Sequence, residues 1–73
     1  MFFVIETQVN NGVGQAIVTT KDTRNEAESD YHRVLQYAAI SEIEIHGAVL
    51  LTEEGAPLKY QSYKHDSTQE AEA

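Results

Sequence analysis

Hydrophobic residues follow two different spacings along this chain of 73 residues. Residues 2–9 and 13–21 are rich in aromatic and β-branched side chains, which favour strands. Between them, Asn11-Gly12 suits a type I′ hairpin turn because both residues accept a positive φ. Residues 24–40 instead carry apolar side chains at intervals of three and four, as an amphipathic helix does. The pattern therefore predicts a hairpin followed by a helix with one apolar stripe, which consists of Ala27, Tyr31, Val34, Leu35, Ala38 and Ala39.

The predicted helix has a clear start signal. Thr23 is followed three residues later by Glu26, the spacing of a capping box. In that arrangement each side chain satisfies a backbone N–H that the first helical turn leaves without a partner. Glu26, Glu28 and Asp30 also suit the positive end of the helix dipole.

A second hairpin is predicted for the remainder of the chain. Residues 42–52, "EIEIHGAVLLT", alternate acid and isoleucine and then become apolar, which indicates a strand. Residues 57–65, "PLKYQSYKH", indicate another, and Pro57 suits an edge position because it has no N–H to donate. Gly55 is the expected positive-φ residue of the connecting turn.

The order ββαββ predicts an α+β fold: a four-stranded, mainly antiparallel sheet with one helix packed on one face. The helix returns the chain to its starting end, so the third strand should run parallel to the second. Sheet order 1-2-3-4 would therefore need a parallel pair, whereas order 2-1-3-4 makes every neighbouring pair antiparallel. Order 2-1-3-4 also places the two more polar strands at the edges, and we expect this order.

Polarity predicts which sheet face the helix covers. In the third strand, alternate residues from Ile43 to Leu51 form a face without charge. The two-residue turn sets the register of the first hairpin and extends this face across the first two strands. A four-residue turn over 53–56 adds Leu58 and Tyr60, whereas a three-residue turn would reverse the fourth strand. The expected helix-facing set is Phe3, Ile5, Thr7, Val9, Ala16, Val18, Ile43, Ile45, Gly47, Val49, Leu51, Leu58 and Tyr60.

The opposite face is then predicted to carry an apolar patch without a helix over it. Such a patch is either small and solvated, covered by the C-terminal tail, or an interface with a partner. The chain has no cysteine to form a disulfide, and a small domain without such a staple is often stabilised by a partner subunit. We therefore expect an interface. Its candidate residues are Phe2, Val4, Ile17, Thr19, Ala48 and Leu50, together with Tyr37, which lies off the helical stripe.

Charge narrows the range of partners. Residues 66–73 contain three of the twelve acidic residues and none of the five basic ones, which leaves −4 of the net charge of −7 on residues 1–65. We expect a single domain over residues 1–65 and a disordered acidic tail over 66–73. No basic stripe is present, so direct nucleic-acid binding is not expected. No leader or membrane-spanning segment is recognisable, so the expected location is the cytoplasm, with no membrane partner.

One group of residues could carry chemistry. The predicted register places Glu42, Glu44, His46, Tyr63 and His65 together, and carboxylates with imidazoles can bind zinc or transfer protons. The same spacing is typical of the solvated side of any half-exposed strand, where acid–histidine pairs form across strands. No motif of a nucleophile, phosphate loop or cofactor site accompanies the group. We therefore predict no catalytic, cofactor-binding or metal-binding residues and no enzymatic activity.

The short opening strand, the turn at Asn11-Gly12, the segment "VTTKDTRNEAESDYH" and the turn "LLTEEG" resemble small proteins encoded by phages and prophages of Gram-positive gut bacteria. The resemblance implies a small accessory protein and supplies no catalytic residues. The sequence as a whole favours a non-catalytic protein-interaction module that forms a homodimer through the exposed sheet face or an edge strand. The alternatives are an acidic inhibitor that blocks a basic groove of a host protein and a small metal-dependent enzyme.

Overall fold

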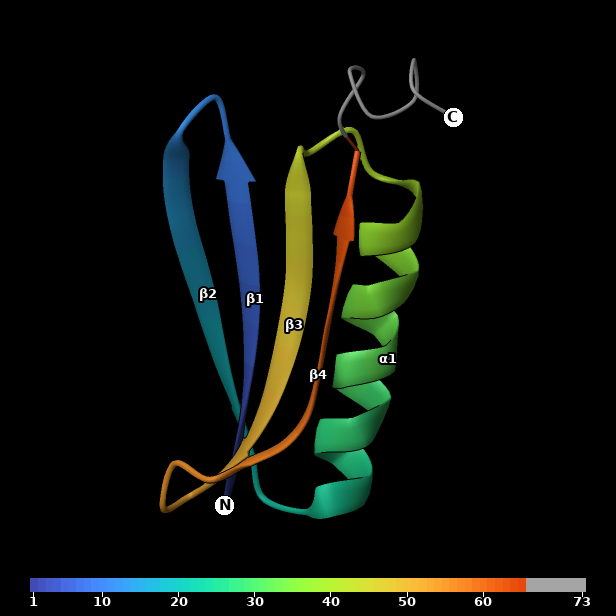
Figure 1. Ribbon diagram of the computed structural model, residues 1–73. Helices are drawn as coiled ribbons and strands as arrows, with labels where there is room; N and C mark the ends of the chain where they lie inside the picture. Colours follow the sequence, from blue (N-terminus) through green and yellow to red (C-terminus); the bar gives the residue numbers. More distant parts are fainter. Residues whose placement is uncertain (66–73) are drawn as a thin grey trace.

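The computed structural model describes residues 1–65 and contains four strands and one helix in the order ββαββ (Figure 1). The strands are β1 (Phe2–Asn10), β2 (Val13–Lys21), β3 (Ile45–Thr52) and β4 (Pro57–Lys64), and the helix is α1 (Arg24–Ile40). The sheet order is β2-β1-β3-β4, and every neighbouring pair is antiparallel. The predicted α+β fold and strand order are confirmed. The disorder expected for residues 66–73 concerns a segment outside the described residues.

Both hairpins have the predicted register. Asn11 and Gly12 adopt φ values of 54° and 78°, and the turn pairs Ile5 with Val18 across β1 and β2. In the second hairpin His46 pairs with Tyr63, and a register shift between Leu50 and Leu51 marks a bulge near the turn. β3 begins at Ile45 rather than at Glu42, so its first residues belong to the connection that follows α1.

Helix α1 begins and ends where the pattern predicts. The Thr23 side chain accepts a hydrogen bond from the Glu26 N–H at 3.2 Å and donates one to the Glu26 carboxylate at 3.1 Å. These contacts satisfy a free donor of the first turn. Among the described residues, no helix is long and apolar enough to cross a membrane.

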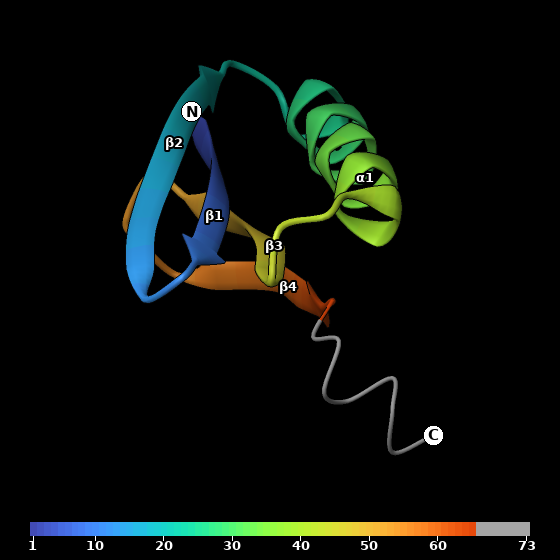
Figure 2. The ribbon, with the colours of Figure 1, turned by 90° about the horizontal axis from the view of Figure 1, so that it is seen from above.

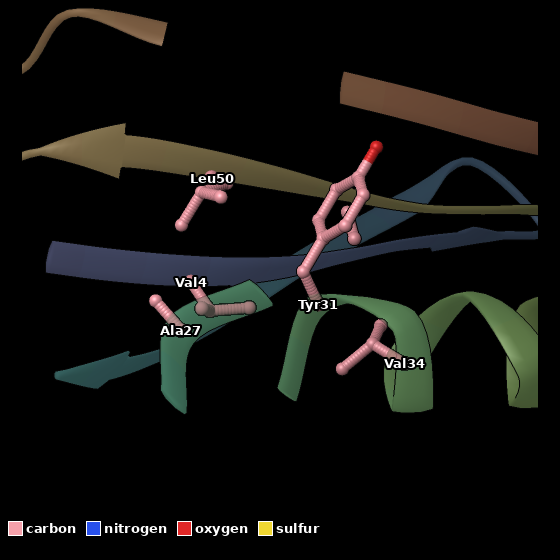
Figure 3. Close-up of a cluster of buried hydrophobic side chains, with 6 residues drawn as sticks. Val4, Ala27, Tyr31, Val34 and Leu50 are labelled. Atoms are coloured by element: carbon pink, nitrogen blue, oxygen red, sulfur yellow. The ribbon is translucent and has the colours of Figure 1, made fainter. Parts of the chain in front are cut away.

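The helix covers the face opposite to the one predicted. Leu50, Val4 and Ala48 are buried, and they form the core with the helical stripe (Figure 3). The side chains that α1 contributes to this core are Ala27, Tyr31 and Val34. Phe2 packs against the cluster, while Ile17 and Thr19 lie on the same face at the margin that α1 leaves uncovered. The prediction that Val4, Ala48 and Leu50 form an exposed patch is therefore wrong.

Chain handedness explains this arrangement. A two-residue turn closes on Asn10 and Val13 as a hydrogen-bonded pair, which decides the direction of every side chain in β1. β2 and β3 run parallel on either side of β1, so α1 is a crossover connection between them, and such connections are right-handed in almost all proteins. The turn fixes the pleat of β1, and with L-residues this pleat points Val4 and Glu6 to one face of the sheet. A right-handed connection then places α1 over that face. Handedness therefore overrides the uncharged character of the other face.

Burial of Tyr31 predicts a pH effect. Burial, and next the neighbouring Tyr63, raise the pKa of the Tyr31 hydroxyl above its ordinary value of about 10. The Tyr31 hydroxyl therefore ionises more readily in the unfolded chain than in the folded one. The stability gained by burying the neutral side chain is complete below the unfolded-state pKa of about 10 and is lost as the pH rises through the folded-state pKa. Ultraviolet absorbance titration should show one of the four tyrosines ionising after the others. Tyr31→Phe should remove that late step, and simultaneous titration of all four tyrosines would contradict the prediction.

Candidate functional site

The sheet face that points away from α1 is mostly apolar. The strand registers place Val18, Ile5, Val49 and Tyr60 in one row across all four strands. Val18 is 58% exposed and Tyr60 is 75% exposed, whereas Ile5 and Val49 are partly shielded by the strands on either side. We call this surface the open face. Its residues in the paired strands are Phe3, Ile5, Thr7, Val9, Gly14, Ala16, Val18, Thr20, Ile45, Gly47, Val49, Leu51, Tyr60, Ser62 and Lys64.

The open face carries one charged residue. Lys64 pairs with Ile45 at one corner, and no acidic residue among residues 1–65 lies on the face. Nine acidic residues lie within residues 1–65, so the charge of this part of the chain is concentrated away from the open face. Water forms few hydrogen bonds with the side chains of the open face. Covering the open face would therefore lower the free energy in proportion to the apolar area removed from solvent.

Gly47 allows β3 and β4 to lie close together in the middle of the open face. A Cβ atom at this position would lie 2.8 Å from the Gln61 carbonyl oxygen and 2.8 Å from the Ser62 Cβ atom. Both distances are shorter than van der Waals contact, so any larger residue would push the two strands apart. Seen from above, the sheet curves around α1, and the open face lies on the outside of that curve (Figure 2).

A buried polar network lies on the other face, beneath the end of α1. His46 is 3% exposed, and both of its ring nitrogens have partners. Nε2 lies 2.6 Å from the Glu6 carboxylate, and Nδ1 lies 2.9 Å from Ser41 Oγ. A carboxylate can only accept, so Nε2 donates to Glu6, and in the neutral ring Nδ1 accepts from the serine hydroxyl.

This serine–histidine–carboxylate chain has the order of a nucleophile, base and acid, but its surroundings do not suit acyl transfer. Ser41 is the C-cap of α1, and its hydroxyl also lies 3.4 Å from the Ala38 carbonyl oxygen. Carbonyl oxygens at a helix C-terminus repel a developing oxyanion, which needs N–H donors instead. The network is therefore best described as a contact that holds the end of α1 against β1 and β3.

The five polar residues predicted to cluster come together only in part: the rings of Tyr63 and His65 stack with centroids 6.4 Å apart, and the backbone N–H of His65 donates to the Glu44 carbonyl oxygen at 2.6 Å. His46 contacts Glu6 and Ser41, whereas His65 Nε2 lies 2.6 Å from the Ala38 carbonyl oxygen. The Glu44 carboxylate accepts from the backbone N–H of Asn11 at the first hairpin turn. Within residues 1–65, no group of three or more histidine, aspartate and glutamate side chains is placed to hold a metal ion.

The interface candidates divide into three groups. Val4, Ala48 and Leu50 belong to the core, and Phe2 packs against it. Ile17 and Thr19 lie on β2, and Ile17 is well exposed. Tyr37 lies off the buried helical stripe, as predicted, and is exposed together with Ile40. The open-face residues are the apolar set that polarity alone predicts to face the helix, and the handedness of the crossover is the signal that places them on the uncovered side.

Comparison of the chain with known protein families, with curated proteins and with solved structures found no match. The functional residues are therefore inferred from exposure, register and contacts. The open face spans all four strands with mostly apolar side chains, and no element within residues 1–65 covers it.

Proposed function

We propose that this protein is a non-catalytic interaction module that forms a homodimer through its open face. The observation that supports the proposal is the uninterrupted apolar row of Val18, Ile5, Val49 and Tyr60, which α1 does not cover. Soluble monomers rarely expose a continuous apolar surface of this kind. A second copy placed face to face would form a sandwich in which two sheets lie inside and one helix lies on each outer side.

The size of the open face is compatible with a small dimer. Four strands at a spacing of about 4.8 Å and eight residues at about 3.3 Å give a face of roughly 500 Å². Two copies would then bury on the order of 1,000 Å² in total, not counting the extra area of side chains that project from the sheet. This total is about the lower bound for a specific interface.

Charge favours a second copy as the occupant. Two strongly acidic chains repel each other in most orientations, but the open face brings no acidic residue to the contact. A small domain without cysteine also gains core volume by this route, because burial of both open faces supplies apolar contacts that one helix cannot provide.

Substitution of Tyr60 by glutamate tests this proposal. Tyr60 is highly exposed, so the monomer should keep its fold, whereas a dimer would have to bury the introduced carboxylate. We expect the dissociation constant measured by sedimentation equilibrium to rise by at least about tenfold, since burial of an unpaired charge costs more than about 1.4 kcal/mol.

Gln61→Glu is the matched control for this substitution. It adds the same charge to the neighbouring residue of β4, whose side chain lies on the helix side of the sheet. The control should leave the dissociation constant nearly unchanged. Equal effects of the two substitutions, or no effect of Tyr60→Glu, would argue against the open face, provided that circular dichroism shows both variants folded.

The geometry does not favour the acidic inhibitor. Several acidic side chains are engaged in local pairs, such as Glu28 with Arg24 and Asp30 with Arg33. The hydrogen bond from Arg24, and next the charge of Lys59, lower the pKa of Glu28, so this carboxylate is charged but already partnered. A nucleic-acid mimic would instead present a row of acidic groups to its target.

A further inference from the structure

Strand β2 is open on its outer edge and poorly covered on both faces. It lies at the end of the sheet that is farthest from α1 in both ribbon views (Figures 1 and 2). Val13 is 70% exposed and Ile17 is 48% exposed on the side of the helix, and Val18 is exposed on the open face. The strand therefore offers backbone and side chains together to a partner.

The two edges of the sheet differ in how they are protected. The β4 edge begins with Pro57, contains a bulge beside Leu50, and carries Lys59 and Lys64, all of which discourage pairing with another strand. β2 has none of these features over residues 13–20, which are uncharged and pair with β1 without a register shift. One edge is thus closed to strand addition and the other is open.

The pleat decides which backbone groups of β2 point outward. Val13 pairs with Asn10 across the two-residue turn, so the odd-numbered residues of β2 direct their N–H and C=O groups toward β1. Gly14, Ala16, Val18 and Thr20 therefore direct theirs away from the sheet. An antiparallel partner strand must meet these four residues with its own hydrogen-bonding groups.

We propose that the β2 strands of two copies pair antiparallel about a twofold axis that passes through Ile17. In this register Ala16 opposes Val18 of the second copy and Gly14 opposes its Thr20, so all four outward-pointing residues gain partners. Ile17 opposes its own counterpart, and no acidic residue of either strand enters the contact. Shifting the register by one step would leave at least one of these outward residues without a partner.

This edge contact goes beyond the proposed open-face dimer. A twofold axis perpendicular to the sheet keeps both helices on one side and leaves both open faces uncovered. The two contacts can therefore form separately, and they close into a tetramer with three perpendicular twofold axes when the two axes meet at a right angle. Each contact can also be removed without touching the other, because Ile17 lies on the helix side and Tyr60 lies on β4.

Cysteine cross-linking tests the register. The chain has no cysteine, so Ile17→Cys introduces the sole thiol. Residues that face each other in a non-hydrogen-bonded antiparallel pair have Cα atoms about 4.5 Å apart, within the range of a disulfide. Under mild oxidation at micromolar protein, Ile17→Cys should form a covalent dimer at least about tenfold faster than a collisional control, because pairing raises the effective thiol concentration.

Val13→Cys is the matched control, since it lies on the same side of the same strand and is more exposed. Its counterpart in the proposed register is Lys21, so it should cross-link slowly. Failure of Ile17→Cys to cross-link, or equal rates for both variants, would overturn the proposal. Ala16→Pro combined with Ile17→Cys should abolish the rapid reaction because it removes an outward N–H, whereas Ala16→Ser should preserve it.

The open-face proposal is tested separately in the same assay. Ile17→Cys combined with Tyr60→Glu should cross-link as fast as Ile17→Cys alone, even where Tyr60→Glu has broken the open-face dimer. Loss of the rapid reaction in the combined variant would mean that β2 does not pair independently, and it would overturn the edge contact while leaving the open-face dimer intact.

Discussion

Replacement of Leu50 by alanine is expected to lower the free energy of unfolding by about 3 kcal/mol, as large-to-small substitutions in well-packed cores do. Leu50 is fully buried beside Val4, its partner across β1 and β3, in the core that α1 covers (Figure 3). The substitution removes apolar contacts and leaves a cavity that the small side chains Ala27 and Ala48 cannot fill. Urea denaturation followed by circular dichroism measures the loss, with an unchanged slope showing that the same surface unfolds.

Leu58→Ala is the control for Leu50→Ala. Leu58 is 37% exposed beside the β4 bulge, so its truncation should cost less than about 1 kcal/mol. The comparison reports directly on which face of the sheet the helix covers. Equal and small losses for the two variants would place Leu50 on an uncovered surface and would contradict the core described above.

Replacement of His46 by leucine is the second substitution with a large expected effect, about 2 kcal/mol of unfolding free energy. It removes the hydrogen bonds to Glu6 and Ser41 and leaves two partly buried polar groups without their partner. Thermal or urea unfolding near neutral pH measures the loss. His32→Leu changes the same residue types on the exposed surface of α1, and it should alter stability by less than about 0.5 kcal/mol.

A double-mutant cycle separates the network from the loss of packing. Glu6→Gln keeps the shape of the side chain and removes its charge, so combining it with His46→Leu should cost less than the sum of the single changes. Strict additivity would mean that the short His46–Glu6 contact contributes nothing to stability. Unaltered stability in His46→Leu alone would show that the network does not hold the end of α1 against the sheet.

Both registers were predictable because short-range features determine them, and the strand order was predictable because only order 2-1-3-4 makes every neighbouring pair antiparallel with the polar strands at the edges. The Asn11-Gly12 turn sets the pairing of β1 with β2, and the four-residue turn sets the pairing of β3 with β4. The boundaries of α1 were also predictable from the sequence, because Thr23 and Glu26 mark the start of the helix and a single apolar stripe runs through it.

The covered face was not predictable from polarity, because both faces of the sheet carry apolar residues. Glu6 and His46 suggested a solvated surface, yet they satisfy each other beneath α1 together with Ser41. These three residues are remote in the sequence or on different elements, and only the folded chain brings them together. The handedness of the crossover connection is the signal that identifies the covered face.

This sheet with two apolar faces has a direct consequence for the candidate site. One helix covers the face of Val4 and Leu50, and no element within residues 1–65 covers the face of Ile5 and Val49. A second copy of the chain would supply that layer with the same apolar surface, which is why self-association is the central feature of the proposed function.

Sedimentation equilibrium of the wild-type chain, from micromolar to millimolar concentration, tests this feature most directly. The account predicts a mass of at least twice the 8.2 kDa of one chain, decreasing toward one chain only at the lowest concentrations. A mass that stays at 8.2 kDa over the whole range would contradict it.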